Sequence, residues 1–268
     1  MSDRAFIDQL DEVWSRIAEV GGQLDAAEWD RPTDCPGWTV RDHVSHLIGT
    51  ESMLLGRSSP PPAPDLDHVK NPIGKANEAW VDERRSWPPD RVLAEFDEIT
   101  RARLAALRAM GDNELAAVGW SPIGQVPYAT FMDVRVMDCW VHEQDIRRAV
   151  DRPGGLTGPA AEAALRRLTS SLPFVVGKRV APPDGTSVVF ELKGPLARTV
   201  AATVTGGRAV AAEAPASPTV TITTDVETYV CLANGRWTAA EALERGRVSF
   251  AGDATLGRLV IDNLATMI

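Results

Sequence analysis

The stretch "RVMDCWVHEQDI", residues 135–146, lies in the longest helical pattern of the chain and carries its most unusual polar residues. At roughly 100° per residue, Asp138, His142 and Asp145 fall on one stripe of a helix predicted over about 127–150. Apolar residues border this stripe on both sides, so the sequence predicts that it faces the interior. A polar set on the far side of the helix is predicted to face solvent, although two large apolar residues there, Val136 and Trp140, do not fit that pattern. The predicted solvent face consists of Asp133, Glu143, Gln144, Arg147 and Arg148.

The buried stripe has two interpretations, because buried charges need either partners or a metal. In the first, Arg135 pairs with Asp138 or Asp145 and His142 is a satisfied core histidine. In the second, Asp138 and His142 present an oxygen and a nitrogen on one helical face, a spacing that suits two ligands of one cation. A third ligand must then come from another helix.

Three other histidines are available as that ligand. His68 lies in a proline-rich connection, 57–74, and is expected to be solvated. His43 and His46 lie at or beyond one edge of the apolar arc of a helix predicted over 40–56. Each alone is more typical of a surface or boundary position than of a ligand, and periodicity does not choose between them.

The rest of the chain predicts an α+β protein of two domains: a helical bundle over 1–180 and a small α+β unit over 184–268, with the boundary in 178–185. Periodicity of about 3.6 predicts helices in the first two-thirds, and alternation of period two predicts strands after about residue 184. The predicted helices cover 2–24, 40–56, 75–86, 91–110, 127–150 and 158–176, with 111–127 as a loop. The predicted strands cover 186–194, 199–207, 218–225 and 247–253, with short helices at 226–234, 238–246 and 254–267.

Composition excludes several classes of protein. The net charge of −9 argues against a nucleic-acid partner. No apolar run approaches the roughly 18 residues of a membrane helix, and acids stand where a signal peptide is basic. We therefore expect a soluble, cytoplasmic protein. Its cysteines, Cys35, Cys139 and Cys231, are odd in number and far apart, so they are expected to be small buried residues rather than disulfides.

Four stretches resemble a known family. "CPGWTVRDHVSHLIGTE" (35–51) is similar to the opening signature of DinB-like metal-binding four-helix bundles, and more closely to the N-terminal domain of actinobacterial mycothiol-dependent maleylpyruvate isomerase-like enzymes. "RVMDCWVHEQDIR" (135–147) resembles the second signature of that family. "TITTDVETYVCLANGR" (221–236) and "RVSFAGDATLGRLV" (247–260) resemble the sterol-carrier-protein-like domain that follows the bundle. The resemblance covers nearly the whole chain.

The resemblance implies a divalent metal, zinc in the isomerase, bound here by His46, Asp138 and His142. Asp145 would then orient a ligand or pair with Arg147 or Arg135. The family's usual acid is Glu, and the shorter Asp138 leaves the identity of the metal open. The thiol cosubstrate that the resemblance implies is mycothiol.

The implied chemistry follows from an open coordination position, which three protein ligands leave on the metal. A thiol bound there becomes a thiolate, which could catalyse cis–trans isomerisation or S-transfer on a small electrophilic substrate. Cys139 points to an apolar flank of its predicted helix, so an external thiol fits the pattern. In the C-terminal domain, Arg236 or Arg247 could anchor the substrate or the thiol, but either could equally be a surface arginine.

Two other functions stay open. The protein could be a binding module for an apolar small molecule, with a metal that is not catalytic, or a metal-dependent hydrolase whose open position holds hydroxide. A missing metal would exclude both the thiol enzyme and the hydrolase, and dependence on a thiol would separate those two. The sequence does not specify the substrate or the oligomeric state.

Overall fold

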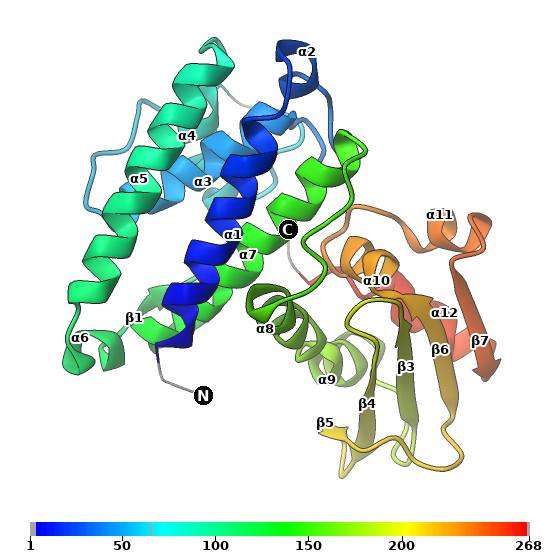
Figure 1. Ribbon diagram of the computed structural model, residues 1–268. Helices are drawn as coiled ribbons and strands as arrows, with labels where there is room; N and C mark the ends of the chain where they lie inside the picture. The colour runs from blue at the N-terminus through cyan, green and yellow to red at the C-terminus, as the bar shows by residue number, and fades with distance from the viewer. Residues whose placement is uncertain (1–3, 65, 267–268) are drawn as a thin grey trace. The chain divides into compact units, whose positions relative to one another are not determined.

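The computed structural model describes residues 4–64 and 66–266 and divides into two compact units, 1–164 and 165–268. The first unit is helical apart from one small hairpin, and the second combines a five-stranded sheet with helices (Figure 1). This architecture confirms the predicted α+β class with two domains.

Four long helices form the framework of the first unit: α1 (Ala5–Gly21), α3 (Val40–Leu54), α5 (Pro89–Ala109) and α7 (Tyr128–Ala149). Helix α1 packs against α5 and α7, and α3 packs against α5 and α7, so the four enclose one core (Figure 1). Their apolar stripes are fully buried, as the helical period predicts. Shorter helices complete the unit: α2 (Ala26–Trp29), α4 (Pro72–Asp82), which packs on α3, and α6 (Asp112–Ala116).

Helix α7 is buried on nearly all sides, so the predicted solvent face was wrong for two of its five residues. Glu143 and Gln144 are 0% and 7% exposed, whereas Asp133 is exposed. The chain that leaves α7 returns along it, and the Trp140 indole nitrogen donates to the Gly155 carbonyl over 2.8 Å. Because this segment covers Trp140, a large apolar residue can occupy the side of the helix that was predicted to face solvent. Within the described ranges, no helix is long and apolar enough to cross a membrane.

The segment predicted as an irregular loop, 111–127, contains α6 and an antiparallel hairpin of β1 (Val118–Ser121) and β2 (Gly124–Pro127). The loop prediction was therefore wrong here. Both strands are mostly exposed, and Trp120 is 61% exposed. Because the hairpin has no buried face, its sequence lacks the alternation from which a strand is predicted.

The sheet of the second unit has the order β5-β4-β3-β6-β7, with β3 and β6 parallel and the other pairs antiparallel. The predicted strands are present, and β5, in an alanine-rich exposed stretch, is an additional one. The strands are β3 (Ser187–Lys193), β4 (Arg198–Thr205), β5 (Arg208–Ala212), β6 (Val220–Asp225) and β7 (Val248–Gly252). The helices of this unit are α9 (Leu172–Phe174), the π-helical turn η1 (Val175–Val180), α10 (Val226–Ala233), α11 (Ala239–Glu244) and α12 (Ala254–Asp262).

The division between the units lies within α8 (Pro159–Thr169), earlier in the chain than the predicted boundary in 178–185. Both α9 and η1 pack on strands β4 and β5, so the residues that lead into the sheet belong with it. The sequence pattern changes where the strands begin, whereas the packing changes where the preceding helices first contact the sheet.

Candidate metal centre

Helix α3 brings two histidines into the interior. Thr39 caps its N-terminus, with its backbone and hydroxyl both donating to Asp42 in a capping box. His43 and His46 follow within the first two turns and are 0% and 4% exposed. The expectation of surface or boundary positions was wrong for both, because α3 packs against α4, α5 and α7 and keeps little free surface.

His46, Asp138 and His142 come together between α3 and α7. His46 Nε2 lies 3.3 Å from Asp138 Oδ2, and His142 Nε2 lies 3.5 Å from Asp138 Oδ1. One possible ligand atom from each of the three lies within 4.8 Å of the others. Ligands about 2.1 Å from a tetrahedral metal are about 3.4 Å apart, so this spacing suits a common cation.

His142 has a second set of neighbours at its other ring nitrogen. Its Nδ1 lies 2.8 Å from Nδ1 of His43 and 3.4 Å from Asp145 Oδ2. His43, His142 and Asp145 could also hold a metal by proximity. However, 2.8 Å is a hydrogen-bond distance and too short for two ligands of one tetrahedral ion. We therefore interpret this side of His142 as a hydrogen-bonded support.

Asp138 is also part of a buried ionic network, which the first interpretation of the sequence anticipated in part. Arg135 donates to Asp138 Oδ2 and, over 2.7 and 3.0 Å, to Glu51 Oε1. Glu51 accepts a further hydrogen bond of 2.9 Å from Arg103. Arg135, Glu51 and Arg103 are each at most 4% exposed. The sequence pattern did not single out Glu51 or Arg103, because charged residues on long helices are usually solvated.

Asp145 pairs with Arg148, which donates to its Oδ1. Arg148 also pairs with Asp34 over 2.9 Å, so it links Asp145 to the loop before α3. The two arginines that the sequence left open as partners of Asp145, Arg135 and Arg147, pair with Glu51 and Glu143 instead.

The electrostatics prepare two of the three groups for ligation. Burial lowers the pKa of His46 to about 4. Burial alone would raise the pKa of Asp138, but Arg135 and His142 outweigh it and hold that pKa well below its usual range. Burial opposes protonation of His142, yet Asp138 and Asp145 together raise its pKa. At neutral pH the first histidine is neutral and the aspartate ionised, as ligands must be, whereas a proton competes for His142.

Trp38 covers the three histidines. Its ring centroid lies 5.2 Å from that of His46, 5.4 Å from that of His43 and 5.8 Å from that of His142. The Trp38 indole nitrogen donates to Glu78 of α4 over 3.0 Å, which fixes the ring from outside. The loop before α3 thus gives the site an aromatic wall.

The proline-rich connection packs against this loop, so His68 is not solvated as expected. Its side chain is only 20% exposed, and its Nε2 lies 3.3 Å from Glu78 Oε2. A Cβ added to Gly37 would lie 2.4 Å from the His68 ring, and Gly37 also has a φ of +79°. Glycine is therefore required at this position for space as well as for conformation.

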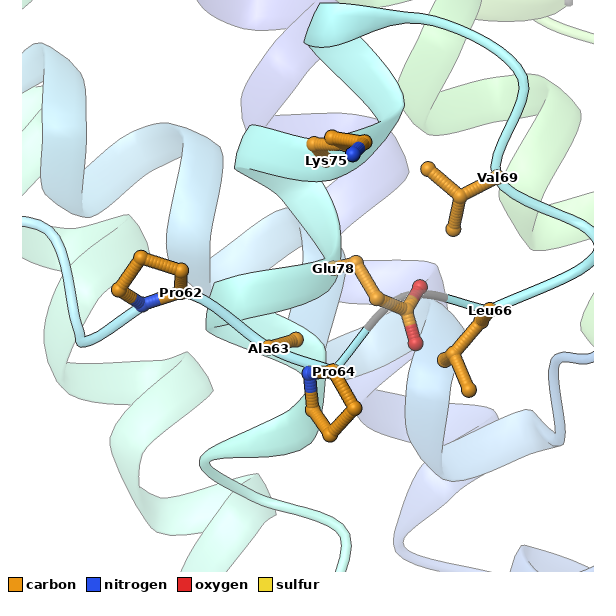
Figure 2. A pocket seen from close by; sticks show the side chains of 7 residues that line it. All are labelled: Pro62, Ala63, Pro64, Leu66, Val69, Lys75 and Glu78. Atoms are coloured by element: carbon orange, nitrogen blue, oxygen red, sulfur yellow. The ribbon is translucent and has the colours of Figure 1, made fainter.

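A small pocket of about 110 Å³ lies outside this wall, lined by Pro62, Ala63, Pro64, Leu66, Val69, Lys75 and Glu78. Figure 2 shows the Glu78 carboxylate pointing between Pro64 and Leu66. Ligand pockets usually measure about 300–1,000 Å³, so this one is too small for a substrate and its cosubstrate together. None of its lining residues belongs to the histidine cluster.

Cys139, next to Asp138, is not a nucleophile in this fold. It is fully buried and accepts hydrogen bonds from Trp14 over 3.3 Å and from Arg135 over 3.6 Å. Burial raises the pKa of its thiol to about 12, so it stays protonated at neutral pH.

The two arginines named from the C-terminal sequence lie in the second unit. Arg236 is half-buried after α10 and donates to the Asn234 carbonyl over 3.0 Å. Arg247 is exposed and pairs with Asp225 over 3.3 Å. An anchoring role for either residue stays a prediction.

Comparison with known proteins matches both units to described families. The sequence profile of the mycothiol maleylpyruvate isomerase N-terminal domain matches residues 10–147, and that of the SCP-2 sterol transfer family matches residues 165–263. The fold is similar to the crystal structure of the mycothiol-dependent maleylpyruvate isomerase, with a TM-score of 0.56 at 18% identity over 94% of this chain and 93% of that one. A histidine-to-alanine mutant of that isomerase gives a TM-score of 0.57 at 16% identity over the same shares.

Two curated relatives are uncharacterized proteins from two strains of Mycobacterium tuberculosis, CDC 1551 and H37Rv. Each is 29% identical over an alignment of 181 residues, and the alignment covers 64% of this chain. The match spans 66% of the length of those relatives, just under two-thirds.

Proposed function

The chain belongs to the mycothiol maleylpyruvate isomerase N-terminal domain family, and from this premise we propose that it is a metal-dependent enzyme that uses mycothiol. Its substrate would be a small electrophile, and its reaction either cis–trans isomerisation or S-transfer. The proposed ligands of a divalent metal, with zinc as the first candidate, are His46, Asp138 and His142. Asp145 would not bind the metal but would orient His142.

One observation carries the proposal: two helices place two imidazole nitrogens 3.3 and 3.5 Å from the two oxygens of a single carboxylate. The donor set also suits a borderline cation such as zinc, which takes nitrogen and oxygen ligands. At His46, Nε2 faces Asp138 Oδ2 over 3.3 Å, whereas Nδ1 is buried without a hydrogen-bond partner among the described residues.

A divalent metal held here supplies Lewis acidity, which lowers the pKa of a thiol or water that it coordinates. The protein's own residues set the conditions for this chemistry. Arg135 holds Asp138 ionised and is itself held in place by Glu51, and Trp38 shields the histidines from water. Fixed ligands in a dry site strengthen the electrostatic interactions there.

In the isomerisation, the thiolate adds to an electron-poor carbon–carbon double bond, and the resulting single bond rotates. Elimination of the same thiolate then restores the double bond with the opposite geometry, so the thiol is not consumed. In S-transfer, the carbanion formed by the addition takes up a proton instead, so the whole thiol stays on the electrophile as a thioether and is consumed. Cys139 beside the cluster does not supply this thiolate, because it is fully buried and its pKa is raised to about 12, and we propose an external thiol instead.

The first experiment measures metal content by elemental analysis of protein purified without a chelator or a histidine tag. We expect about one divalent metal per chain in the wild type and loss of metal in Asp138→Asn and His142→Ala. Asp133→Asn is the matched control, since Asp133 lies on the same helix but is exposed. Wild-type protein without metal after reloading with zinc would contradict the proposal and favour a buried network in a small-molecule binding protein.

The second experiment separates a thiol enzyme from a hydrolase. The metal-loaded protein is incubated with small activated alkenes, with and without mycothiol, and geometric isomers and thiol adducts are quantified. We expect turnover only with the thiol and none in Asp138→Asn. Turnover of esters or amides without a thiol would instead favour the hydrolase.

A further inference from the structure

We propose that His43 and Thr33 are positioning residues that fix the tautomer of His142, with its proton on Nδ1 and its lone pair on Nε2. This inference rests on the proposed function for its consequence in metal binding, but the tautomer itself can be tested without metal. Neither residue is among the three proposed ligands.

The argument starts at Thr33, in the loop before α3. Its Oγ1 donates to the carbonyl of Trp38 over 3.0 Å, and a carbonyl oxygen can only accept. A hydroxyl has one proton, so Thr33 Oγ1 has none left for His43 Nε2, which lies 2.8 Å away. His43 must therefore donate from Nε2 to Thr33.

The donor role of His43 in its bond to Thr33 fixes which ring carries the proton in the contact between His43 and His142. A neutral imidazole that carries its proton on Nε2 presents a lone pair at Nδ1. His43 Nδ1 lies 2.8 Å from His142 Nδ1, and two lone pairs at that distance would repel each other. The proton in this contact must therefore belong to His142 Nδ1.

The carboxylates on the two sides of the His142 ring oppose each other, because Asp138 Oδ1, 3.5 Å from Nε2, is balanced at Nδ1 by Asp145. Its Oδ2 lies 3.4 Å from His142 Nδ1, and an ionised carboxylate can only accept. The other oxygen, Oδ1, is engaged by Arg148. Both neighbours of His142 Nδ1 are thus acceptors, and the shorter contact is the one to His43.

The consequence lies at the opposite nitrogen of the ring. His142 Nε2 is left with a lone pair on the side of Asp138 and His46, the side that has the spacing of a metal site. A histidine ligand is usually oriented by a hydrogen bond from its other nitrogen, which fixes both the tautomer and the ring plane. Here that bond would be made to a second histidine, which a threonine in turn orients.

The direct test is nitrogen NMR of the ring atoms in protein labelled at histidine. The chain has four histidines, so the spectrum can be assigned with single substitutions. In metal-free protein at about pH 9, above the ordinary histidine range, we expect the Nε2–H tautomer for His43 and the Nδ1–H tautomer for His142. An Nε2–H tautomer for His142 would overturn the inference, whether or not the protein binds metal.

The second test compares zinc affinity by competition with a chelator. His43→Leu should weaken binding by about 10–100-fold, the usual effect of removing a partner that orients a ligand. His43 is fully buried and its loss could unfold the protein, so Thr33→Val provides a milder variant, with an expected loss of about tenfold. Thr33→Ser keeps the hydroxyl and should restore wild-type affinity.

Thr100→Val is the matched control, since Thr100 donates to the Phe96 carbonyl within α5 and does not contact the histidines through that bond. Equal zinc affinity in Thr33→Val and Thr100→Val would overturn the inference. If wild-type protein binds no zinc, the proposed function fails, and the NMR result then decides whether the hydrogen-bond chain exists.

Discussion

Glu51→Gln is the substitution that tests the buried network most severely. The Glu51 carboxylate is fully buried and accepts bonds of 2.7 and 3.0 Å from Arg135 and of 2.9 Å from Arg103. Glutamine keeps the shape of the side chain but removes the charge between the two guanidinium groups. It also introduces an amide donor facing groups that can only donate.

The expected loss of stability arises because the guanidinium charges of Arg135 and Arg103 remain buried after Glu51 has lost its charge. Breaking a buried ion pair by removing one partner costs about 3–5 kcal/mol, because the other charge is then buried without compensation. Arg135 keeps Asp138 as a partner, so the lower half of this range applies to it. The Arg103 guanidinium keeps Tyr128 as a neutral acceptor 2.9 Å away, while its Nη1 already has no partner among the residues that the structure describes. We expect a loss of about 3–4 kcal/mol in the free energy of unfolding.

Urea unfolding followed by tryptophan fluorescence measures this loss. Of the eight tryptophans, all except Trp237 belong to residues 1–164, so the signal reports mainly on the helical unit. With a slope near 2 kcal/mol per molar urea, the midpoint should fall by about 2 M.

The matched control is Glu98→Gln, which breaks the exposed pair of Glu98 with Arg57, and it should cost less than about 1 kcal/mol. If Glu51→Gln and Glu98→Gln shift the midpoint equally, the reasoning about buried charge is refuted.

Three further predictions concern pH, close packing and thiol reactivity. Because the pKa of His46 is lowered to about 4, the unfolded chain binds a proton that the native state does not, and acidification from about pH 6.5 to 4 should remove about 3 kcal/mol of stability. The same pH series on His46→Gln should show a shallower slope, and an identical slope would contradict the assignment. Gly49→Ala should cost about 1–3 kcal/mol by thermal unfolding, since its Cβ would lie 2.3 Å from that of Trp80, whereas Gly119→Ala meets nothing within 4 Å and should be nearly neutral. Cys139, whose pKa is raised to about 12 by burial, should resist alkylation by iodoacetamide at neutral pH until the protein is unfolded, as mass spectrometry of the modified peptide would reveal.

The helices and strands with a buried face were the most predictable parts of the fold. The framework helices, and strands such as β3 and β6, show the apolar period of their type because one face must meet the core. The exposed hairpin β1–β2 and the edge strand β5 lack that pattern, and neither was predicted.

The site was predictable only in part, and the reason differs from residue to residue. Asp138 and His142 share a helix, so their spacing of four residues already places them on one face. His46 was singled out by resemblance, because its helical period alone did not separate it from His43. The burial of Glu51 and Arg103 could not be predicted from either helix alone, because each is buried only with its oppositely charged partner and that partner lies on another helix.

The sequence by itself determined the two-domain α+β class and the stripe that carries Asp138, His142 and Asp145, because both follow from residue spacing along the chain. Tertiary structure alone decided which neighbours each nitrogen of His142 has, with a carboxylate and His46 on one side and His43 and Asp145 on the other. Hydrogen bonds and metal coordination depend on differences of a few tenths of an ångström between atoms of separate helices. Such distances are set by how α3 and α7 pack together and are not encoded in the periodicity of either helix.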